Sequence, residues 1–401
     1  MAALALVGAV MTGCSSDDNI IDTPQQPVNN GKTVTLTMTV GLNGGGETRA
    51  LAADGTKTFA AGEKMAVIYK KTGGATAMAE TEALKDDGDI TNSGKSATFT
   101  VTLEDPDKTQ DVTYVYPAAM VNSDGTVKND ALAEQDGTLS SLGSNLDYCT
   151  NSGAWDNGAL PELTLDNQFA ILAITLKDTD GSNDITNTFD GLTIEDGTNT
   201  YNVTRTKAAG PIYVAILPTA DADIEVTAYD GPVFYPKSLT TKTYEASKGY
   251  SVSWKMTRVG IDLARIKSGI TVTAQDGDVI KGTLQPGPTY WTKVEIADVA
   301  TVALSDASIS GIANAGLTCL GNATINLVGT NTLNTYSLGI FVPSEKTLTI
   351  DGSGSLTATG DNEAPGIGGN GNIKINGGTA GCHGILCPCS LHERGRFLTS
   401  W

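Results

Sequence analysis

The stretch LTIDGSGSL, residues 348–356, places apolar residues at alternate positions and then turns through glycine and serine. Similar units start at Val302 (VALSDASIS), Ile325 (INLVGTNTL) and Ile373 (IKINGGT), so that successive units begin 23, 23 and 25 residues apart. Self-similarity at this period without helix-forming residues is typical of a β-solenoid, in which each rung buries its apolar residues by stacking on the next. The repeat therefore predicts a β-solenoid over residues 262–379, with rungs of about 23 residues.

Three sets of positions can be aligned from unit to unit. The opening apolar pairs are Val302/Leu304, Ile325/Leu327, Leu348/Ile350 and Ile373/Ile375. A second apolar position recurs at Ile309, Leu333 and Leu356, and a glycine–apolar step recurs at Gly316-Leu317, Gly339-Ile340 and Gly366-Ile367. We expect each set to form a column of stacked residues, with Gly, Asn and Asp making the corners between strands.

Upstream of the solenoid the apolar residues alternate at period two in short runs, separated by Gly, Asp and Asn. The clearest runs are TVTLTMTV (33–40), KMAVIYKK (64–71), DVTYVYP (111–117), FAILAITL (169–176) and IYVAILP (212–218). Short alternating strands at this spacing predict antiparallel β-sandwiches. We expect one sandwich over residues 33–150 and a second over 160–257. The predicted fold class is all-β: two antiparallel β-sandwich domains followed by a short, truncated parallel β-helix or solenoid.

The N-terminus has the pattern of a targeting segment. Residues 1–13 are short, apolar and uncharged, and Cys14 and the polar run SSDD follow. A short apolar segment that ends in small residues predicts a secretory signal peptide. Residues 14–32 contain DTPQQPVNNG, which is typical of a flexible linker.

Thr12, Gly13 and Cys14 resemble the lipobox of bacterial lipoproteins. This resemblance implies that Cys14 is lipidated and becomes the first residue of the mature chain, which would anchor the protein in outer-membrane lipid as a surface-exposed lipoprotein. Met11 and the lack of a basic segment depart from the family pattern. The alternative is an unmodified cysteine after a fortuitous apolar start.

The order of TVTLTMTV, ETRA, FAAGEKMAVIY, VTYVYPA, AILAITL and YVAILP along residues 33–257 resembles the fimbrillin family of surface lipoproteins. Members are two-domain β-sandwich proteins, and many are pilus subunits that assemble by strand exchange with other fimbrial subunits. In that process a protease cuts after an arginine near the first strand, and a partner's strand fills the groove. Arg49 matches the cleavage position, and an ordinary surface arginine is the alternative.

Residues of the solenoid, including SGITVTAQDGDVIKGTL and LTIDGSGSLTATG, resemble a β-helical carbohydrate-binding module. The resemblance implies surface glycans as possible ligands. Tyr290 and Trp291 are adjacent aromatic residues near the start of the solenoid and would form a stacking platform for sugars. A packed cap of the solenoid is the alternative role for them.

The composition argues against several kinds of chemistry. A net charge of −19 disfavours nucleic acid as a partner. The two histidines, His383 and His392, both lie in residues 380–401, so the rest of the chain has none for a catalytic triad, a Cys–His pair or a histidine-ligated zinc site. No catalytic residue, metal site or cofactor is predicted.

Carboxylate chemistry stays open as an alternative. The candidates are Asp276, Asp278, Asp306 and Asp351, since solenoid lyases and glycosidases use clustered acids. Asp276 and Asp278 could also hold calcium weakly. Ordinary turn formation is the competing explanation for all four.

The tail AGCHGILCPCSLHERGRFLTSW, residues 380–401, contains Cys382, His383, Cys387, Cys389 and His392. Its C-x-C spacing differs from the usual zinc-site pairs, and the repeat gives way to a different composition after Thr379. We interpret the tail as the product of a frameshift or assembly error. A metal-binding tail or an unrecognised terminal segment are the alternatives.

Together these features predict a non-catalytic cell-surface lipoprotein, a fimbrial or adhesin component acting at a tip, as an accessory subunit or alone. A glycan-binding surface protein for polysaccharide capture is the second hypothesis. A polysaccharide lyase or glycosidase is the third.

Overall fold

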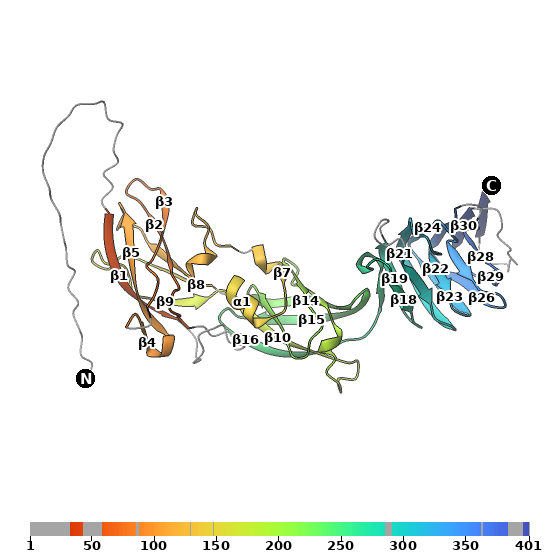
Figure 1. Cartoon of the computed structure of the whole chain (residues 1–401), viewed down its shortest axis with the longest axis horizontal. Helices are drawn as coiled ribbons and strands as arrows, with labels where there is room; N and C mark the ends of the chain where they lie inside the picture. The colour runs from red at the N-terminus through yellow and green to blue at the C-terminus, as the bar shows by residue number, and fades with distance from the viewer. Residues whose placement is uncertain are drawn as a thin grey trace, which may run out of the picture.

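The structure is a computed structural model, and it describes residues 33–42, 58–85, 88–128, 130–146, 148–284, 291–361, 364–383 and 396–400. It consists almost entirely of β-strands. Three bodies follow one another along the long axis of the molecule: a first sandwich, a second sandwich and a solenoid (Figure 1). The predicted all-β fold, with two sandwiches and a C-terminal solenoid, is confirmed.

The first sandwich is one eight-stranded sheet that folds over its own core, in the order β3-β2-β6-β8-β9-β1-β5-β4. Its strands are β1 (Thr33–Leu42), β2 (Ala66–Lys70), β3 (Thr76–Glu80), β4 (Ile90–Thr91), β5 (Ser96–Glu104), β6 (Val112–Tyr116), β8 (Cys149–Gly153) and β9 (Leu163–Asn167), with a 3-10 turn η1 at Asn92–Gly94. Phe59 contacts Phe99 and Tyr116 edge-on inside it, with ring centres 5.4 and 4.7 Å apart. Strand β1 pairs antiparallel with β5 and parallel with β9.

The second sandwich buries its core between two sheets. One has the order β13-β10-β16 and consists of β10 (Ala170–Lys177), β13 (Ile212–Ile216) and β16 (Gly249–Lys255). The other contains β7 (Glu134–Gln135), β11 (Gly191–Glu195), β12 (Thr200–Thr204), β14 (Thr219–Asp230) and β15 (Val233–Tyr244), with a 3-10 turn η4 at Thr186–Thr188 nearby. Most pairs are antiparallel, but β10 runs parallel to β16.

Strands β2 and β6 form a wall between the two sandwiches. Val67 and Tyr114 face the first core, whereas Ala66 and Val115 belong to the second. Successive residues of a strand point to opposite faces, so both faces of this part of the sheet are buried. The two sandwiches therefore share a packed boundary.

The chain crosses this boundary at places other than the expected limits of 150 and 160. The segment with η2 (Ala118–Met120), η3 (Asp130–Leu132) and α1 (Leu139–Asn145) sends Met120, Leu132, Leu142 and Leu146 into the second core. The chain then returns, and β9 pairs with β1 in the first sheet. Alternation shows that a strand has a buried face, but long-range pairing decides which core that face joins.

The solenoid stacks parallel strands on three sides. The five-stranded side contains β18 (Thr271–Ala274), β20 (Lys293–Ile296), β22 (Leu317–Cys319), β25 (Ile340–Val342) and β28 (Ile367–Gly369). The other two sides contain β19 (Val279–Leu284), β21 (Ala300–Ser310), β23 (Ala323–Val328), β24 (Thr330–Asn334), β26 (Thr347–Gly352), β27 (Ser355–Thr359), β29 (Asn372–Ile375), β30 (Thr379–His383) and β31 (Arg396–Ser400). Strand β17 (Gly260–Asp262) and the 3-10 turn η5 (Leu263–Arg265) precede them.

The register of the rungs differs from the one expected for the opening apolar pairs. Val302 pairs with Ile325 as expected, but Ile325 pairs with Ile350, and Leu348 pairs with Ala323. The step between these rungs is therefore 25 residues and not 23. A shift of two residues keeps the same side chains facing inward, so the apolar pattern alone cannot fix the register.

The same shift affects the second apolar position. Leu333 pairs with Ala358, and Leu356 pairs with Asn331, whose side chain is buried. The expected column of Ile309, Leu333 and Leu356 is wrong in its last member.

The glycine–apolar steps stack as expected. Leu317 pairs with Ile340, and Ile340 with Ile367. The glycines before them pack closely, since a side chain at Gly316 would lie 2.6 Å from the backbone oxygen of Gly339. These corners require glycine for steric reasons, which explains why they mark the repeat reliably.

The parallel ladder continues beyond Thr379, where the repeat was expected to end. Strand β30 pairs with β27, and β31 pairs with β30. Cys382 and His383 are part of β30, whereas Cys387, Cys389 and His392 lie outside the described residues. The interpretation of the tail as a frameshift stays a prediction.

Candidate functional sites on the first strand and the solenoid

Strand β1 belongs to the first sandwich, with one face in the core and the other in solvent. Met38 and Val40 are buried in the core, while the threonines that alternate with them, Thr37 and Thr39, face outward. On the outer face the hydroxyl of Thr35 hydrogen-bonds to that of Thr102 at 2.9 Å. Removal of β1 would uncover the core between β5 and β9, which is the groove that strand exchange requires.

Three of the residues singled out in the sequence cannot be placed. Cys14, Arg49 and Tyr290 lie outside the described residues. Lipidation at Cys14 and processing at Arg49 therefore stay predictions.

Trp291 lies at a corner just before β20 and is 67% exposed. Its backbone oxygen accepts a hydrogen bond of 3.1 Å from the side-chain amide of Asn314, one rung later. The side chain of Trp291 is therefore not part of the buried solenoid core, and its role in sugar stacking stays a prediction.

Three of the four candidate acids support corners of the solenoid. Asp276 accepts a hydrogen bond from the backbone N–H of Thr301 at 2.8 Å, and Asp306 accepts one from Thr330 at 2.9 Å. Both bonds join one rung to the next. Asp351 accepts from the N–H of Gly352 within its own turn, at 2.7 Å. The turn explanation therefore accounts for these carboxylates.

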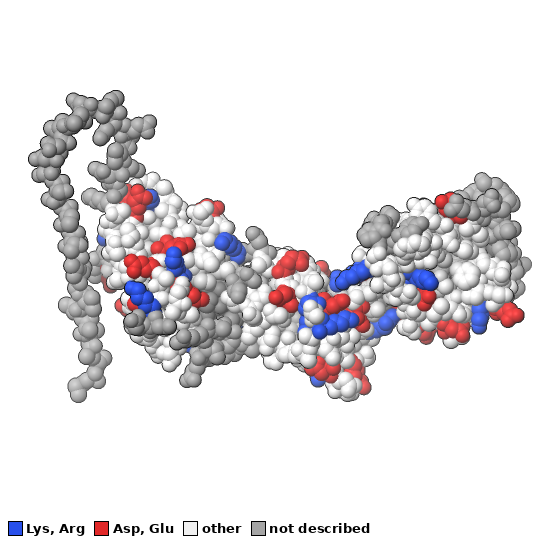
Figure 2. Space-filling view, in the orientation of Figure 1, with Lys and Arg blue, Asp and Glu red and all other residues white. Residues whose placement is uncertain are grey.

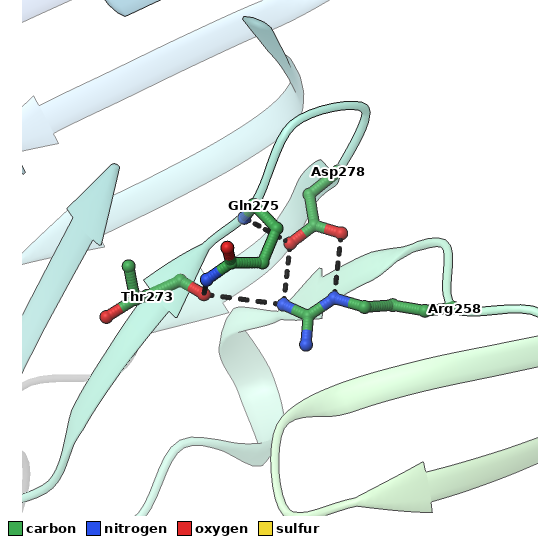
Figure 3. Close-up of polar contacts among 4 residues, drawn as sticks. All are labelled: Arg258, Thr273, Gln275 and Asp278. Atoms are coloured by element: carbon green, nitrogen blue, oxygen red, sulfur yellow. Dashed lines mark hydrogen bonds and ion pairs between the residues drawn. The ribbon is translucent and has the colours of Figure 1, made fainter. Parts of the chain in front are cut away.

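The fourth acid, Asp278, is nearly buried and forms an ion pair with Arg258, whose side chain is 32% exposed (Figure 3). Nη2 and Nε of Arg258 donate to the two carboxylate oxygens at 2.7 and 3.0 Å, and the backbone N–H of Gln275 donates to the carboxylate at 2.8 Å. The bond to Asp278 raises the pKa of the Arg258 guanidinium. Asp278 is thus bound to Arg258 and is not paired with Asp276 as a calcium ligand.

The residues that sequence reasoning missed are Arg258 and Asn331. Arg258 is two residues before β17 in no recognisable motif, and only the fold brings it to Asp278. The sequence indicates Asn331 only weakly, as a polar residue at an inward position of the alternating stretch TNTLN.

Within the described ranges, no three His, Cys, Asp or Glu side chains are grouped so that they could hold a metal ion. In the same part of the chain, no helix is long and apolar enough to cross a membrane.

One side of the solenoid carries an array made mostly of hydroxyl groups. Its uncharged outward positions, aligned from rung to rung, are Thr283, Ser308, Thr332 and Thr357 in one column, Ser310, Asn334 and Thr359 in a second, and Thr330, Ser355 and Thr379 in a third. In the next strands the second column continues to His383 and the third to Arg396. Adjacent strands are about 4.8 Å apart, so these groups repeat with the rung spacing. Such an array can hydrogen-bond an uncharged polar ligand along the solenoid axis.

Charged side chains are scattered over both sandwiches, while the viewed side of the solenoid has a broad uncharged area (Figure 2). In the same view, acidic and basic side chains lie along the lower edge of the solenoid, in a chain whose net charge is −19.

No family model matches the chain, and no curated protein matches it. Several solved structures are similar to part of this chain. One is a proposed cell adhesion protein from Bacteroides fragilis NCTC 9343, with 13% sequence identity and a TM-score of 0.32. The alignment covers 56% of this chain and 96% of that protein. A fimbrial assembly protein from Parabacteroides distasonis ATCC 8503 has 12% identity, a TM-score of 0.31 and coverage of 56% and 90%.

A proposed cell adhesion protein from Bacteroides eggerthii DSM 20697 has 16% identity, a TM-score of 0.29 and coverage of 55% and 85%. At these values the similarity carries no argument about function. By their descriptions, these three structures are two proposed cell adhesion proteins and one fimbrial assembly protein.

Proposed function

We propose that the chain is a non-catalytic cell-surface adhesion component of the fimbrial kind, in which two sandwiches form a stalk and the solenoid is the distal module. The end-to-end order of the three bodies carries this proposal (Figure 1). It separates β1 at the start of the described chain from the solenoid by the full length of both sandwiches. The structural use of Asp276, Asp278, Asp306 and Asp351 supports a non-catalytic role.

The first part of the proposal is that the N-terminus anchors the chain to the membrane. Cys14, lipidated, would attach the chain to outer-membrane lipid, and residues 14–32 would span the distance to β1. Several acyl chains give a firm anchor, since each buried CH2 contributes about 0.8 kcal/mol. The solenoid would then project away from the membrane.

Strand exchange with other fimbrial subunits is the second part. Cleavage after Arg49 would release the segment that contains lipidated Cys14 and β1, and would open the groove between β5 and β9 for a partner's strand. Anchoring through Cys14 therefore describes the chain before this cleavage. Because a solenoid follows the second sandwich, a tip, accessory or stand-alone role fits better than a repeating stalk subunit.

The intact mass of the surface-extracted protein tests anchoring and processing together. Before cleavage the parent chain should carry an acyl mass at Cys14, and a Cys14→Ala variant should lose both this mass and its attachment to the membrane. After cleavage the parent chain should begin beyond Arg49 and lack the acyl group, whereas an Arg49→Ala variant should keep both the segment and the acyl group. Masses that differ between parent and variants only by the substituted side chain would contradict the two assignments.

Adhesion is tested with cells that display the chain. Such cells should bind to host or partner-cell surfaces more strongly than cells without it. Equal binding would contradict the adhesive role. The appearance of new reducing ends or unsaturated products from soluble polysaccharides would contradict the non-catalytic one.

Glycan capture is a second candidate function, favoured by the array of hydroxyl groups and by the exposure of Trp291. A glycan array probed with the purified chain would test it. Trp291→Ala and a double Thr332→Val/Thr357→Val variant should each weaken any binding, whereas Thr37→Ala in the first sandwich should not. If the parent chain bound no glycan, glycan capture would be contradicted and the adhesive role would be the remaining proposal.

A further inference from the structure

The second sandwich and the solenoid are joined by a continuous sheet. Strand β17 pairs antiparallel with β15 through Val233–Ile261 and Phe234–Gly260. On its other side β17 runs parallel to β19, the strand of the first solenoid rung. The first rung thus has no open edge here, because strands of the sandwich continue its sheet.

Backbone hydrogen bonds extend this connection beyond the paired residues. The N–H of Val259 donates to the oxygen of Phe234 at 3.1 Å, and that of Asp262 donates to Pro232 at 2.8 Å. The N–H of Val279 donates to the oxygen of Val259 at 2.8 Å. The segment around β17 is therefore tied to the sandwich on one side and to the solenoid on the other.

The two backbones approach so closely that a side chain is excluded. A Cβ atom at Gly260 would collide with the backbone oxygen of Val279 and would lie 2.6 Å from its nitrogen. Distances below about 3 Å do not occur for real Cβ atoms, so this position admits glycine only unless the strands move apart.

Cationic side chains of the solenoid side pack on aromatic rings of the sandwich. The guanidinium of Arg265 is 3.6 Å from the ring centre of Tyr229, and the ammonium of Lys281 is 4.4 Å from that of Phe234. Both rings belong to the β14–β15 hairpin. Contacts of this kind stabilise by about 0.5–2 kcal/mol each, depending on exposure.

The Arg258–Asp278 ion pair joins the residues that precede β17 and β19 (Figure 3). Arg258 also donates to the backbone oxygen of Thr273 at 3.3 Å, so it contacts the solenoid at two points. The Asp278 side chain is only 4% exposed. Loss of one partner would leave a nearly buried charge unpaired, which is strongly destabilising.

We propose that the second sandwich is the N-terminal cap of the solenoid, and that the Arg258–Asp278 pair fixes this cap so that the two bodies unfold as one cooperative unit without a hinge between them. Solenoids require a cap because a terminal rung lacks a neighbour on one side. Here the continuous sheet supplies that neighbour. Domains of one chain usually move relative to each other unless their interface is large, and the shared sheet removes this freedom.

Hydrogen exchange followed by mass spectrometry on the purified full chain tests the proposal. In the parent chain, peptides that contain residues 259–262 and 279–284 should exchange as slowly as those from residues 323–328. Arg258→Met should speed exchange of the first two by roughly 100-fold or more, since breaking a buried pair has a large effect. Arg258→Lys, which keeps the charge but loses the two-point geometry, should show an intermediate increase.

Two further variants make the result decisive. Lys207→Met removes an exposed ion pair with Asp230 on the same hairpin, and it should leave exchange at residues 259–262 within about two-fold. A double Arg258→Met/Asp278→Leu variant should recover most of the protection, because no charge is left unpaired. The proposal is overturned if parent residues 259–262 already exchange much faster than the solenoid core, or if Arg258→Met and Arg258→Lys both behave like Lys207→Met.

Discussion

The side-chain oxygen of Asn331 accepts a hydrogen bond from the backbone N–H of Ala307, one rung earlier, at 2.9 Å. The Asn331 amide donates to the backbone oxygens of Val328 at 3.1 Å and of Ser355, one rung later, at 3.0 Å. Asn331 is fully buried. One side chain thus joins the backbones of three consecutive rungs where apolar packing alone would leave polar groups without partners.

We expect Asn331→Leu to destabilise the solenoid. It removes a buried acceptor and donor and leaves the N–H of Ala307 and the oxygen of Ser355 unsatisfied, each costing about 1–3 kcal/mol. Denaturant unfolding would measure the loss. Asn334→Leu in the same strand is exposed and serves as control, and an equal loss in both variants would contradict the role of Asn331.

Gly260→Ala should weaken the contact between β17 and β19. A Cβ atom there meets the backbone of Val279, which cannot rotate away, so the strands must separate at a cost of about 1–3 kcal/mol or more. Gly41→Ala is a matched control, because the nearest atom is the Thr164 hydroxyl at 3.2 Å, a side chain that can move. Thermal unfolding should show a clearly lower midpoint for Gly260→Ala alone.

Met38→Ala tests whether β1 carries part of the first core. Met38 is 3% exposed, and truncation of such a residue costs about 2–5 kcal/mol. Its neighbour Thr37 faces solvent, so Thr37→Ala should change stability by less than about 0.5 kcal/mol. Chemical denaturation compares them, and similar midpoints for the two variants would argue against a structural role for the inward face of β1.

Asp178 should contribute to stability in a pH-dependent way. The hydrogen bond from the Asn183 side chain lowers the pKa of this carboxyl from 3.8 to about 2. Because the folded pKa lies below the unfolded value, the contribution is complete above pH 3.8 and is lost as the pH falls through about 2. The thermal midpoint of the parent chain should fall more than that of Asp178→Asn between pH 5 and pH 2, and parallel curves would exclude this linkage.

Cys319 should resist thiol reagents in the folded protein. Its side chain is fully buried in the solenoid, and burial raises the pKa of the thiol to about 12. The thiolate is the reactive form, so iodoacetamide at pH 8 should leave Cys319 unmodified until the chain is unfolded. Peptide mass spectrometry before and after addition of guanidinium would show this, and rapid labelling of the native chain would refute it.

Particular residues show why some predictions from sequence succeeded. The alternation of Val40 and Thr39 fixes which face of β1 is buried, because successive strand residues point in opposite directions. The glycine–apolar steps located the solenoid corners, since close backbone approach at Gly316 and Gly339 admits no side chain.

Other features depended on contacts between distant segments. The side chain of Gln135 bonds both the N–H and the oxygen of Ala215, at 2.9 and 2.8 Å, and so satisfies the edge of β13 from 80 residues away. Nothing in the local pattern around Gln135 indicates that partner. The register between Ile325 and Ile350 was likewise missed, because two-residue shifts preserve the inward face.

The sequence by itself determined the β class, the change from sandwiches to solenoid and the inward face of most strands, because these follow from the period of apolar residues and from where glycine is required. Only the tertiary structure decided which core each strand joins, how the rungs are aligned, and that Arg258 meets Asp278 across the boundary between sandwich and solenoid. These depend on pairing between residues far apart in the chain, and period-two alternation is the same for every possible partner.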